Sequence, residues 1–144
     1  MGKRRKAREL ALQALYQIDF HGPSSEISLD PFWEEHKQSP ETLDFARRLV
    51  EGVRSREEEI NKLIELHSEH WKISRMSRVD RNILRIAVCE LLEMRDIPCK
   101  VTIDEAIELG KKFGTSESGA FINGILDQVL KQLTREQKIS KVES

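Results

Sequence analysis

The sequence predicts an all-α protein of about seven helices, arranged as two small helical bundles that share one core. Apolar residues recur every three to four positions along most of the chain, which is the period of an α helix. No segment shows the sustained alternation of apolar and polar residues that is typical of a half-buried strand. The stretch 78–94 is apolar on nearly every side, so other helices must surround it.

The length of 144 residues favours one domain. We expect an N-terminal half at about 3–70, a C-terminal half at about 74–133, and a frayed polar tail at 134–144. The chain is 38% hydrophobic, which is enough for a packed core, and its net charge is −1. Any contact with nucleic acid must therefore come from a local basic patch.

The stretch 78–94 is expected to be the central helix, with Ser77 as its N-cap and Asp80 in its first turn. It is too short and too charged to cross a membrane. Four arginines lie on or just before its polar ridge: Arg75, Arg78, Arg81 and Arg85. These side chains either bind a partner or cover apolar surface while pairing with acidic residues, and the sequence leaves both readings open.

The first helix is expected to begin near the N-terminus and to end at Gly22-Pro23. Its apolar stripe has helical spacing and consists of Ala7, Leu10, Ala11, Ala14, Leu15 and Ile18. We expect three polar or aromatic side chains to lie off this stripe: Arg8, Gln13 and Tyr16.

A basic cluster occupies the start of this helix and consists of Lys3, Arg4, Arg5, Lys6 and Arg8. Positive charge at a helix N-terminus opposes the helix dipole by roughly 0.3–1 kcal/mol per charge. Stability alone therefore does not explain the cluster, and binding of an anionic polymer is favoured over a merely solvated tail.

A short helix is expected near 30–37, with Pro31 in its first turn. Ser39-Pro40 then begins a helical pattern that reaches about residue 69 and can bend or break between Gly52 and Arg56. Three apolar residues of the next connection are expected to fill the seam between the two halves: Trp71, Ile73 and Met76.

Two further helices follow the central one. Thr102 and Glu105 have the spacing of a capping box, and Gly114 suits the C′ position that closes a helix. A cap at Thr115 or Ser116 is expected to open the last helix.

No catalytic, cofactor or metal site is predicted. The chain lacks a Gly-rich phosphate loop, and His67 with His70 would need further ligands to hold a metal ion. Cys89 and Cys99 are expected to be reduced thiols of a cytoplasmic protein, because no secretion signal precedes them.

The turn 111–116 before Phe121 is a third candidate for binding. It offers Lys111, Lys112 and a helix N-terminus, which suits phosphate, while aromatic rings can stack on unpaired bases. A Phe in this position is more often part of a core.

Four segments together resemble the family of the transcription antitermination factor NusB. They are RRKARELALQALYQID at 4–19, DRNILRIAVCELL at 80–92, VTIDEAIELGKKFG at 101–114 and FINGILDQVL at 121–130. The resemblance covers about 130 residues in the same order and spacing, with 21–45 divergent.

The resemblance implies an all-helical, non-catalytic protein that binds the boxA element of nascent RNA. It implies a small-subunit ribosomal protein as partner, called NusE in this role, together with other Nus factors on the RNA polymerase elongation complex. The result is suppression of termination, especially in ribosomal RNA transcription. Some members form homodimers, and the sequence does not fix the oligomeric state.

The resemblance also implies an RNA surface, made of Lys3, Arg4, Arg5, Lys6, Arg8, Tyr16, Lys112, Phe121 and Asn123. Ala120 stands where relatives often carry a basic residue, which puts a phosphate contact there in doubt. The NusE face is expected on the second bundle, including the exposed side of the central helix. Arg78 and Arg81 stay open between RNA, partner and packing.

Two other functions are weighed against this one. A similar helical domain precedes the catalytic domain of some ribosomal RNA methyltransferases, but this chain shows no S-adenosylmethionine-binding loop. A protein-interaction bundle without direct RNA contact is the second alternative.

Overall fold

The computed structural model describes residues 2–21, 28–69 and 71–136, and across these ranges it contains helices and no strand. The elements are α1 (Gly2–His21), α2 (Asp30–Glu35), α3 (Pro40–Ser55), α4 (Glu57–Leu66), the short 3₁₀ helix η1 (Ile73–Arg75), α5 (Arg78–Glu93), α6 (Cys99–Phe113) and α7 (Ser118–Arg135). The predicted all-α class with about seven helices is confirmed. The expected frayed tail falls largely on 137–144, outside the described residues.

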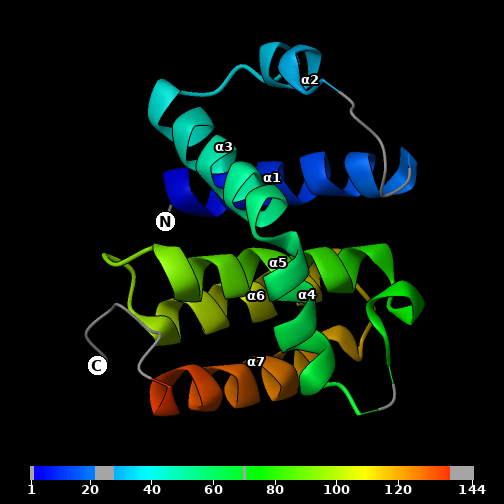
Figure 1. The fold of residues 1–144 in the computed structure, drawn as a ribbon. Helices are drawn as coiled ribbons and strands as arrows, with labels where there is room; N and C mark the ends of the chain where they lie inside the picture. The colour runs from blue at the N-terminus through cyan, green and yellow to red at the C-terminus, as the bar shows by residue number, and fades with distance from the viewer. Residues whose placement is uncertain (1, 22–27, 70, 137–144) are drawn as a thin grey trace.

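The helices form two layers (Figure 1). In the upper layer α1 and α3 cross, with α2 above them, and α5, α6 and α7 lie below. The helix α4 packs against α5 and α7 as well as α3, so it joins the layers. The division into halves near residue 70 stays a prediction, because one continuous cluster of buried side chains runs through both layers.

The helix α5 is central, as predicted, and it contacts α1, α3, α4, α6 and α7. Its residues Ile83, Leu84 and Leu91 are fully buried. The predicted cap is confirmed, because the Asp80 backbone N–H donates to Ser77 Oγ at 3.0 Å. Burial on all sides of one helix holds the two layers together through the hydrophobic effect.

The helix boundaries in the N-terminal half follow the sequence signals closely. Ser39 caps α3 by accepting a hydrogen bond from the Thr42 backbone N–H at 3.2 Å. The expected break falls at Arg56, between α3 and α4. The last helical residue of α4 is Leu66, somewhat before the predicted end near 69.

The prediction of a capping box at Thr102 is wrong. The helix α6 begins at Cys99 after Pro98, so Thr102 lies inside the helix and is buried. Its hydroxyl donates to Glu90 Oε1 at 3.0 Å, and this contact with α5 explains a polar residue at that position.

Gly114 ends α6 as predicted, but in extended backbone and not in the left-handed C′ conformation. A Cβ at this position would lie 2.8 Å from the Gly110 carbonyl oxygen, so close packing requires glycine here. The helix α7 begins at Ser118, later than the caps predicted at Thr115 or Ser116. Thr115 Oγ1 accepts instead from the Glu117 backbone N–H, within the turn before the helix.

The connection between α4 and α5 is only partly buried. Ile73 and Met76 are buried as predicted, but the prediction for Trp71 is wrong because this side chain is 49% exposed.

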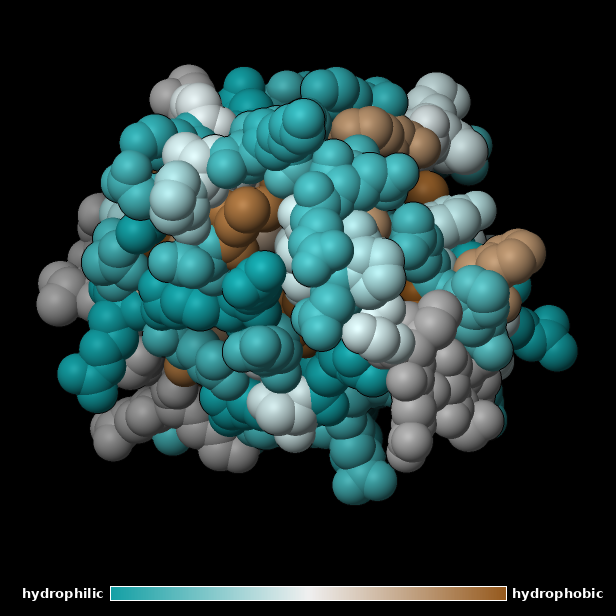
Figure 2. Space-filling view, turned by 90° about the horizontal axis from the view of Figure 1, so that it is seen from above, coloured by the Kyte–Doolittle hydropathy of each residue, from teal (hydrophilic) through white to brown (hydrophobic). Residues whose placement is uncertain are grey.

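Seen from above, the layer that holds α1 and α3 is mostly hydrophilic, with separate hydrophobic patches (Figure 2).

Gly52 lets α3 approach α5 closely. A Cβ there would lie 2.6 Å from Cys89 Sγ, a distance that real Cβ atoms do not show. Cys89 is buried, neither cysteine forms a disulfide, and burial raises the Cys89 pKa to about 12. Cys89 is therefore a packing residue in its thiol form.

We predict that Gly52→Ala lowers the free energy of unfolding by about 1–3 kcal/mol, because the core between α3 and α5 would be overpacked. Gly124→Ala is the matched control, since a Cβ at this position in α7 meets nothing within 4 Å. The control should be neutral or stabilise the protein by up to about 1 kcal/mol, because glycine is unfavourable inside a helix. Urea unfolding measures both, and equal effects would contradict the close-packing argument.

Candidate nucleic-acid interface

Arg8 is buried, which contradicts the expectation that it lies off the apolar stripe. Its guanidinium donates two hydrogen bonds to the Glu90 carboxylate, from Nε at 2.7 Å and from Nη2 at 3.0 Å. Glu90 is 1% exposed and also accepts from the Thr102 hydroxyl. The other two expectations are confirmed, because Gln13 and Tyr16 are exposed. Arg8 thus ties α1 to α5 and is not presented to a ligand.

The rest of the basic cluster stays near the surface but is largely paired. Arg5 forms two hydrogen bonds to Glu105 of α6, at 2.7 and 3.0 Å. These bonds hold the Glu105 pKa below its ordinary value, against the opposing effect of burial. Arg4 Nη2 lies 2.6 Å from Asp96 Oδ2, and its guanidinium also sits over the Phe45 ring.

Lys3 pairs with Glu41 of α3, and this contact lowers the Glu41 pKa. Lys6 is half-buried and forms no ion pair with any described residue. The structure therefore confirms that the cations gather at one end of α1, but it places acidic side chains from α3, α6 and the α5–α6 connection against them.

Lys112 belongs to the same surface. Its Nζ lies 2.8 Å from Glu9 Oε2, so it bridges α6 to α1 as Arg5 does. A narrow cleft of about 120 Å³ runs between these two helices, and its lining includes Arg5, Glu9, Glu105 and Lys112. The structure thus brings Lys112 together with the N-terminal cluster, although more than 100 residues separate them in the sequence.

Phe121 and Asn123 are not part of this cleft. Asn123 is exposed on α7, and Phe121 is half-buried and lines a separate pocket. The predicted RNA surface therefore divides into a basic surface at the start of α1 and an aromatic pocket at the start of α7.

Arg81 and Arg85 both pair with Asp19 of α1. Arg81 Nε donates to Asp19 Oδ2 of α1 at 2.6 Å, and Arg85 Nη1 lies 3.3 Å from the same oxygen. Asn82 Nδ2 also donates to it, at 3.0 Å. Arg78 differs, because it is exposed and sits 5.3 Å from the centre of the exposed Phe20 ring.

Sequence reasoning missed the carboxylates that pair with the predicted cations. They are Glu9, Asp19, Glu41, Glu90, Asp96 and Glu105. The near-zero net charge was the one signal that could have found them, because it requires a carboxylate for almost every cation.

The structure describes no metal centre. His67 Nε2 lies 2.6 Å from Gln132 Oε1, and His70 is outside the described residues. No group of three potential metal ligands occurs in the part of the chain that the structure describes. Within the same part, none of the helices has the length and apolar character that crossing a membrane requires.

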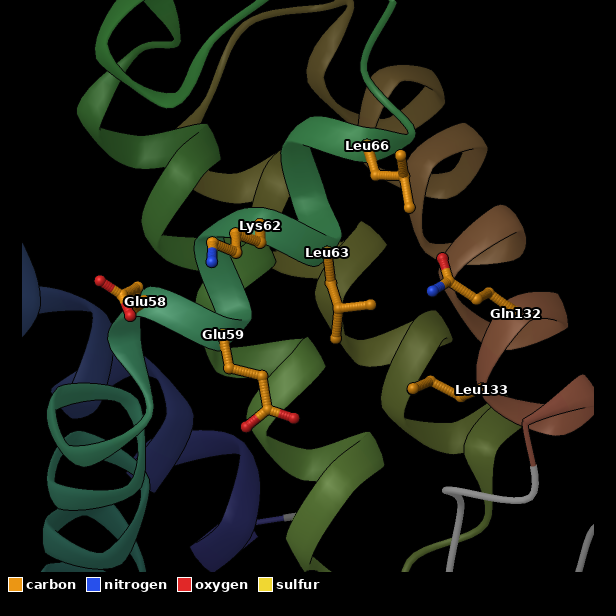
Figure 3. Close-up of a pocket in the computed structure, with 7 residues that line it drawn as sticks. All are labelled: Glu58, Glu59, Lys62, Leu63, Leu66, Gln132 and Leu133. Atoms are coloured by element: carbon orange, nitrogen blue, oxygen red, sulfur yellow. The ribbon is translucent and has the colours of Figure 1, made fainter.

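A groove between α4 and α7 has a different character, with a volume of about 350 Å³. Leu63 of α4 points toward Leu133 of α7, and charged side chains such as Glu59 stand around it (Figure 3). None of the residues predicted to bind RNA lines this groove. Leu66 also lines it and is 66% exposed.

The described residues thus form an all-α protein. Its candidate interface is the cleft between α1 and α6, which ion pairs line. The NusB family model matches residues 5–131. The chain is 50% identical to the transcription antitermination protein NusB of Myxococcus xanthus, over 94% of this chain and 99% of that protein. It therefore belongs to the NusB family.

Solved structures agree with this assignment. A NusB structure from T. maritima superimposes with a TM-score of 0.82 at 40% identity, covering 94% of this chain and 95% of the other. A structure of the antitermination factors NusB and NusE in complex with double-stranded RNA gives a TM-score of 0.78 at 30% identity, covering 92% and 98%.

We predict that Arg8→Ala lowers the free energy of unfolding by about 3–5 kcal/mol, because it leaves the Glu90 carboxylate buried without its cation. The double variant Arg8→Met, Glu90→Leu should recover most of this loss, since it removes both charges together. Urea unfolding of the three proteins measures it. A loss below about 1 kcal/mol for Arg8→Ala would show that the pair does not hold α1 on α5.

The Asp19 site predicts a dependence of stability on pH. Burial raises the Asp19 pKa, but hydrogen bonds from Arg81 and Asn82 outweigh it, so the pKa lies below the ordinary 3.8. The ionised Asp19 therefore contributes to the free energy of unfolding, and this contribution is complete above pH 3.8. It is lost as the pH falls through the lowered pKa.

We therefore predict that Asp19→Asn lowers the free energy of unfolding at pH 7 by about 2 kcal/mol, since hydrogen bonds to a charged acceptor are lost. The difference from wild type should shrink as the pH falls below 3.8. Thermal unfolding at several pH values measures it, and a difference that is constant with pH would contradict the assignment.

Proposed function

We propose that the protein is a non-catalytic, RNA-binding transcription antitermination factor of the cytoplasm. It binds boxA-type single-stranded RNA together with the ribosomal protein NusE, and it joins other Nus factors on the RNA polymerase elongation complex to suppress termination, especially in ribosomal RNA transcription. Membership in the NusB family is the observation that carries this proposal. The solved relative that is in complex with NusE and double-stranded RNA supports NusE and RNA as the classes of partner.

The basic surface at the start of α1 is the proposed entry point for the RNA backbone. It consists of Lys3, Arg4, Arg5, Lys6 and Lys112, which gather at the α1–α6 cleft and near it. Arg8 is left out of the contact set, because it is buried against Glu90. In this proposal Arg8 holds the helix that carries the other cations.

RNA binding at this surface requires phosphates to replace the carboxylates that pair with the cations. The pairs Lys3–Glu41 and Arg4–Asp96 are exposed, and exposed pairs of this kind are worth only about 0–1 kcal/mol. A phosphate oxygen can therefore replace the carboxylate at little cost. The carboxylates act as weak competitors of the RNA, and they keep the free protein close to neutral.

The pairing also supports the alternative, a protein-interaction bundle that does not contact RNA directly. If the carboxylates are permanent partners, they neutralise most of these cations and weaken the attraction for phosphate. The two functions make opposite predictions for variants that release the cations.

We predict that Asp96→Asn tightens binding of boxA-type RNA, measured with recombinant NusE present, by about 2- to 5-fold, since it frees Arg4 from a pair worth up to about 1 kcal/mol. Arg4→Ala with Arg5→Ala should weaken binding and flatten the dependence of log K on log salt by about 0.7 per lost phosphate contact. Fluorescence anisotropy of labelled RNA at several salt concentrations measures both.

The matched control is Asp127→Asn, which frees Lys131 on α7 from a similarly exposed pair at 3.3 Å. It should leave the affinity unchanged. If Asp96→Asn behaves like this control and the double arginine variant binds as wild type does, the basic surface does not contact RNA. Equal affinity for a scrambled RNA in the presence of NusE would contradict the boxA part of the proposal.

A further inference from the structure

The groove between α4 and α7 presents apolar surface inside a polar rim. Leu66 is 66% exposed and Leu63 is half-buried. Leu63 points toward Leu133 of α7, so the three leucines line one groove of about 350 Å³ (Figure 3). Apolar surface that is rimmed by polar residues marks a binding site more often than a scattered exposed leucine does. The groove therefore suits the apolar side chains of another segment.

The rim is acidic at the end where α4 begins. Glu58 and Glu59 lie in the first turn of α4, line the groove and are exposed. Glu59 pairs with Arg56 at 3.0 Å, whereas Glu58 forms no ion pair with a described residue. An occupant with cations near this end and apolar side chains beyond it would match the groove in charge as well as in polarity.

The helix α7 ends toward this acidic end. Gln132 lies 2.6 Å from His67, which follows the last residue of α4, whereas the next residue, Leu133, faces Leu63 (Figure 3). Contacts thus move back along α4 as they move forward along α7. The chain that follows Arg135 therefore leaves α7 beside Glu58 and Glu59.

The sequence that follows α7 has the required composition. Residues 137–144, which lie outside the described residues, read QKISKVES. They carry two apolar side chains three positions apart, Ile139 and Val142, and each of these directly follows a lysine, Lys138 or Lys141. The cations come first along the chain, which is the order that entry from the acidic end requires.

The distances allow this segment to reach the groove. Leu133 precedes Arg135 by two residues, or about 3 Å along the helix axis. Ile139 follows Arg135 by four residues, which can span up to about 14 Å. Because the segment is attached to the groove, its effective concentration there is in the millimolar range, which a separate partner seldom reaches.

We propose that residues 137–144 of this chain bind in the α4–α7 groove. Ile139 and Val142 cover the groove leucines, and the two lysines lie at the acidic end. The proposal replaces the expectation of a frayed tail and does not depend on RNA binding. A protein partner can use this groove only if it displaces the segment.

Disulfide exchange in the full-length chain tests the proposal. Lys62→Cys places a thiol at the edge of the groove, and Ser140→Cys places one in the segment, while the apolar side chains of both are kept. The native Cys89 and Cys99 are buried. In a glutathione buffer, the ratio of oxidised to reduced protein should be about 10-fold or more above that of a control pair, because binding raises the effective concentration.

The control pair is Lys131→Cys with Ser140→Cys. Lys131 is exposed on α7, does not line the groove, and precedes Ser140 by only nine residues. A segment without a fixed position would therefore meet Lys131 at least as often as Lys62, since shorter loops close more readily. Equal ratios for the two pairs, or a higher ratio for the control pair, would overturn the proposal.

Two sets of substitutions test the contacts. Ile139→Ser with Val142→Ser should lower the ratio of the Lys62→Cys pair to that of the control pair, whereas Ser144→Ala should leave it unchanged. Lys138→Glu with Lys141→Glu should lower it by about 2- to 5-fold, the size expected for exposed ion pairs. A ratio that the serine variant does not change would overturn the apolar contacts.

Alkylation of Lys62→Cys alone separates the segment from a second copy of the chain. The serine variant should raise the rate of reaction with a maleimide by about 3-fold or more, at every protein concentration. Protection that grows with protein concentration and persists in the serine variant would show that a second copy occupies the groove. That result would overturn the proposal.

Discussion

The buried pair between Arg8 and Glu90 is the interaction on which the arrangement of the charged surface depends. It joins α1 to α5 inside the core, and Thr102 adds a third helix to the same carboxylate. Loss of one member of a buried charge pair strongly destabilises the protein, because the other charge stays buried without a partner. Arg8 must therefore face Glu90, and this requirement restricts the rotation of α1 about its own axis. That rotation decides which of the N-terminal cations face the α1–α6 cleft and which face α3.

Much of the fold could be predicted because it rests on local signals. The all-apolar character of α5, the Ser77 and Ser39 caps, and the break near Arg56 are all readable from short stretches of sequence. Thr102 shows where this reasoning ends. Its spacing to Glu105 matches a capping box, yet both side chains are used by other helices, Thr102 by α5 and Glu105 by α1. Tertiary contacts of this kind leave no trace in local spacing.

The candidate interface was harder to predict than the fold. The sequence locates the cations, but their partners lie up to 103 residues away, as in Lys112–Glu9. Periodicity also placed Arg8 off the apolar stripe, because a helical pattern treats every charged residue as exposed. The prediction for Trp71 erred in the opposite direction, because an apolar residue in a connection was expected to be buried and this side chain is 49% exposed. In both cases the exposure of the side chain depends on contacts between elements, which the local pattern does not contain.

In the proposed function, the surface cations exchange carboxylates for phosphates while the buried Arg8 keeps Glu90 as its partner. NMR of the arginine Nε–H groups, with assigned signals and RNA added in the presence of NusE, tests this claim most directly. We expect the signals of Arg4 and Arg5 to shift on addition of RNA while that of Arg8 stays in place. Unchanged signals for all three, or a shift of Arg8 as large as that of Arg5, would contradict it.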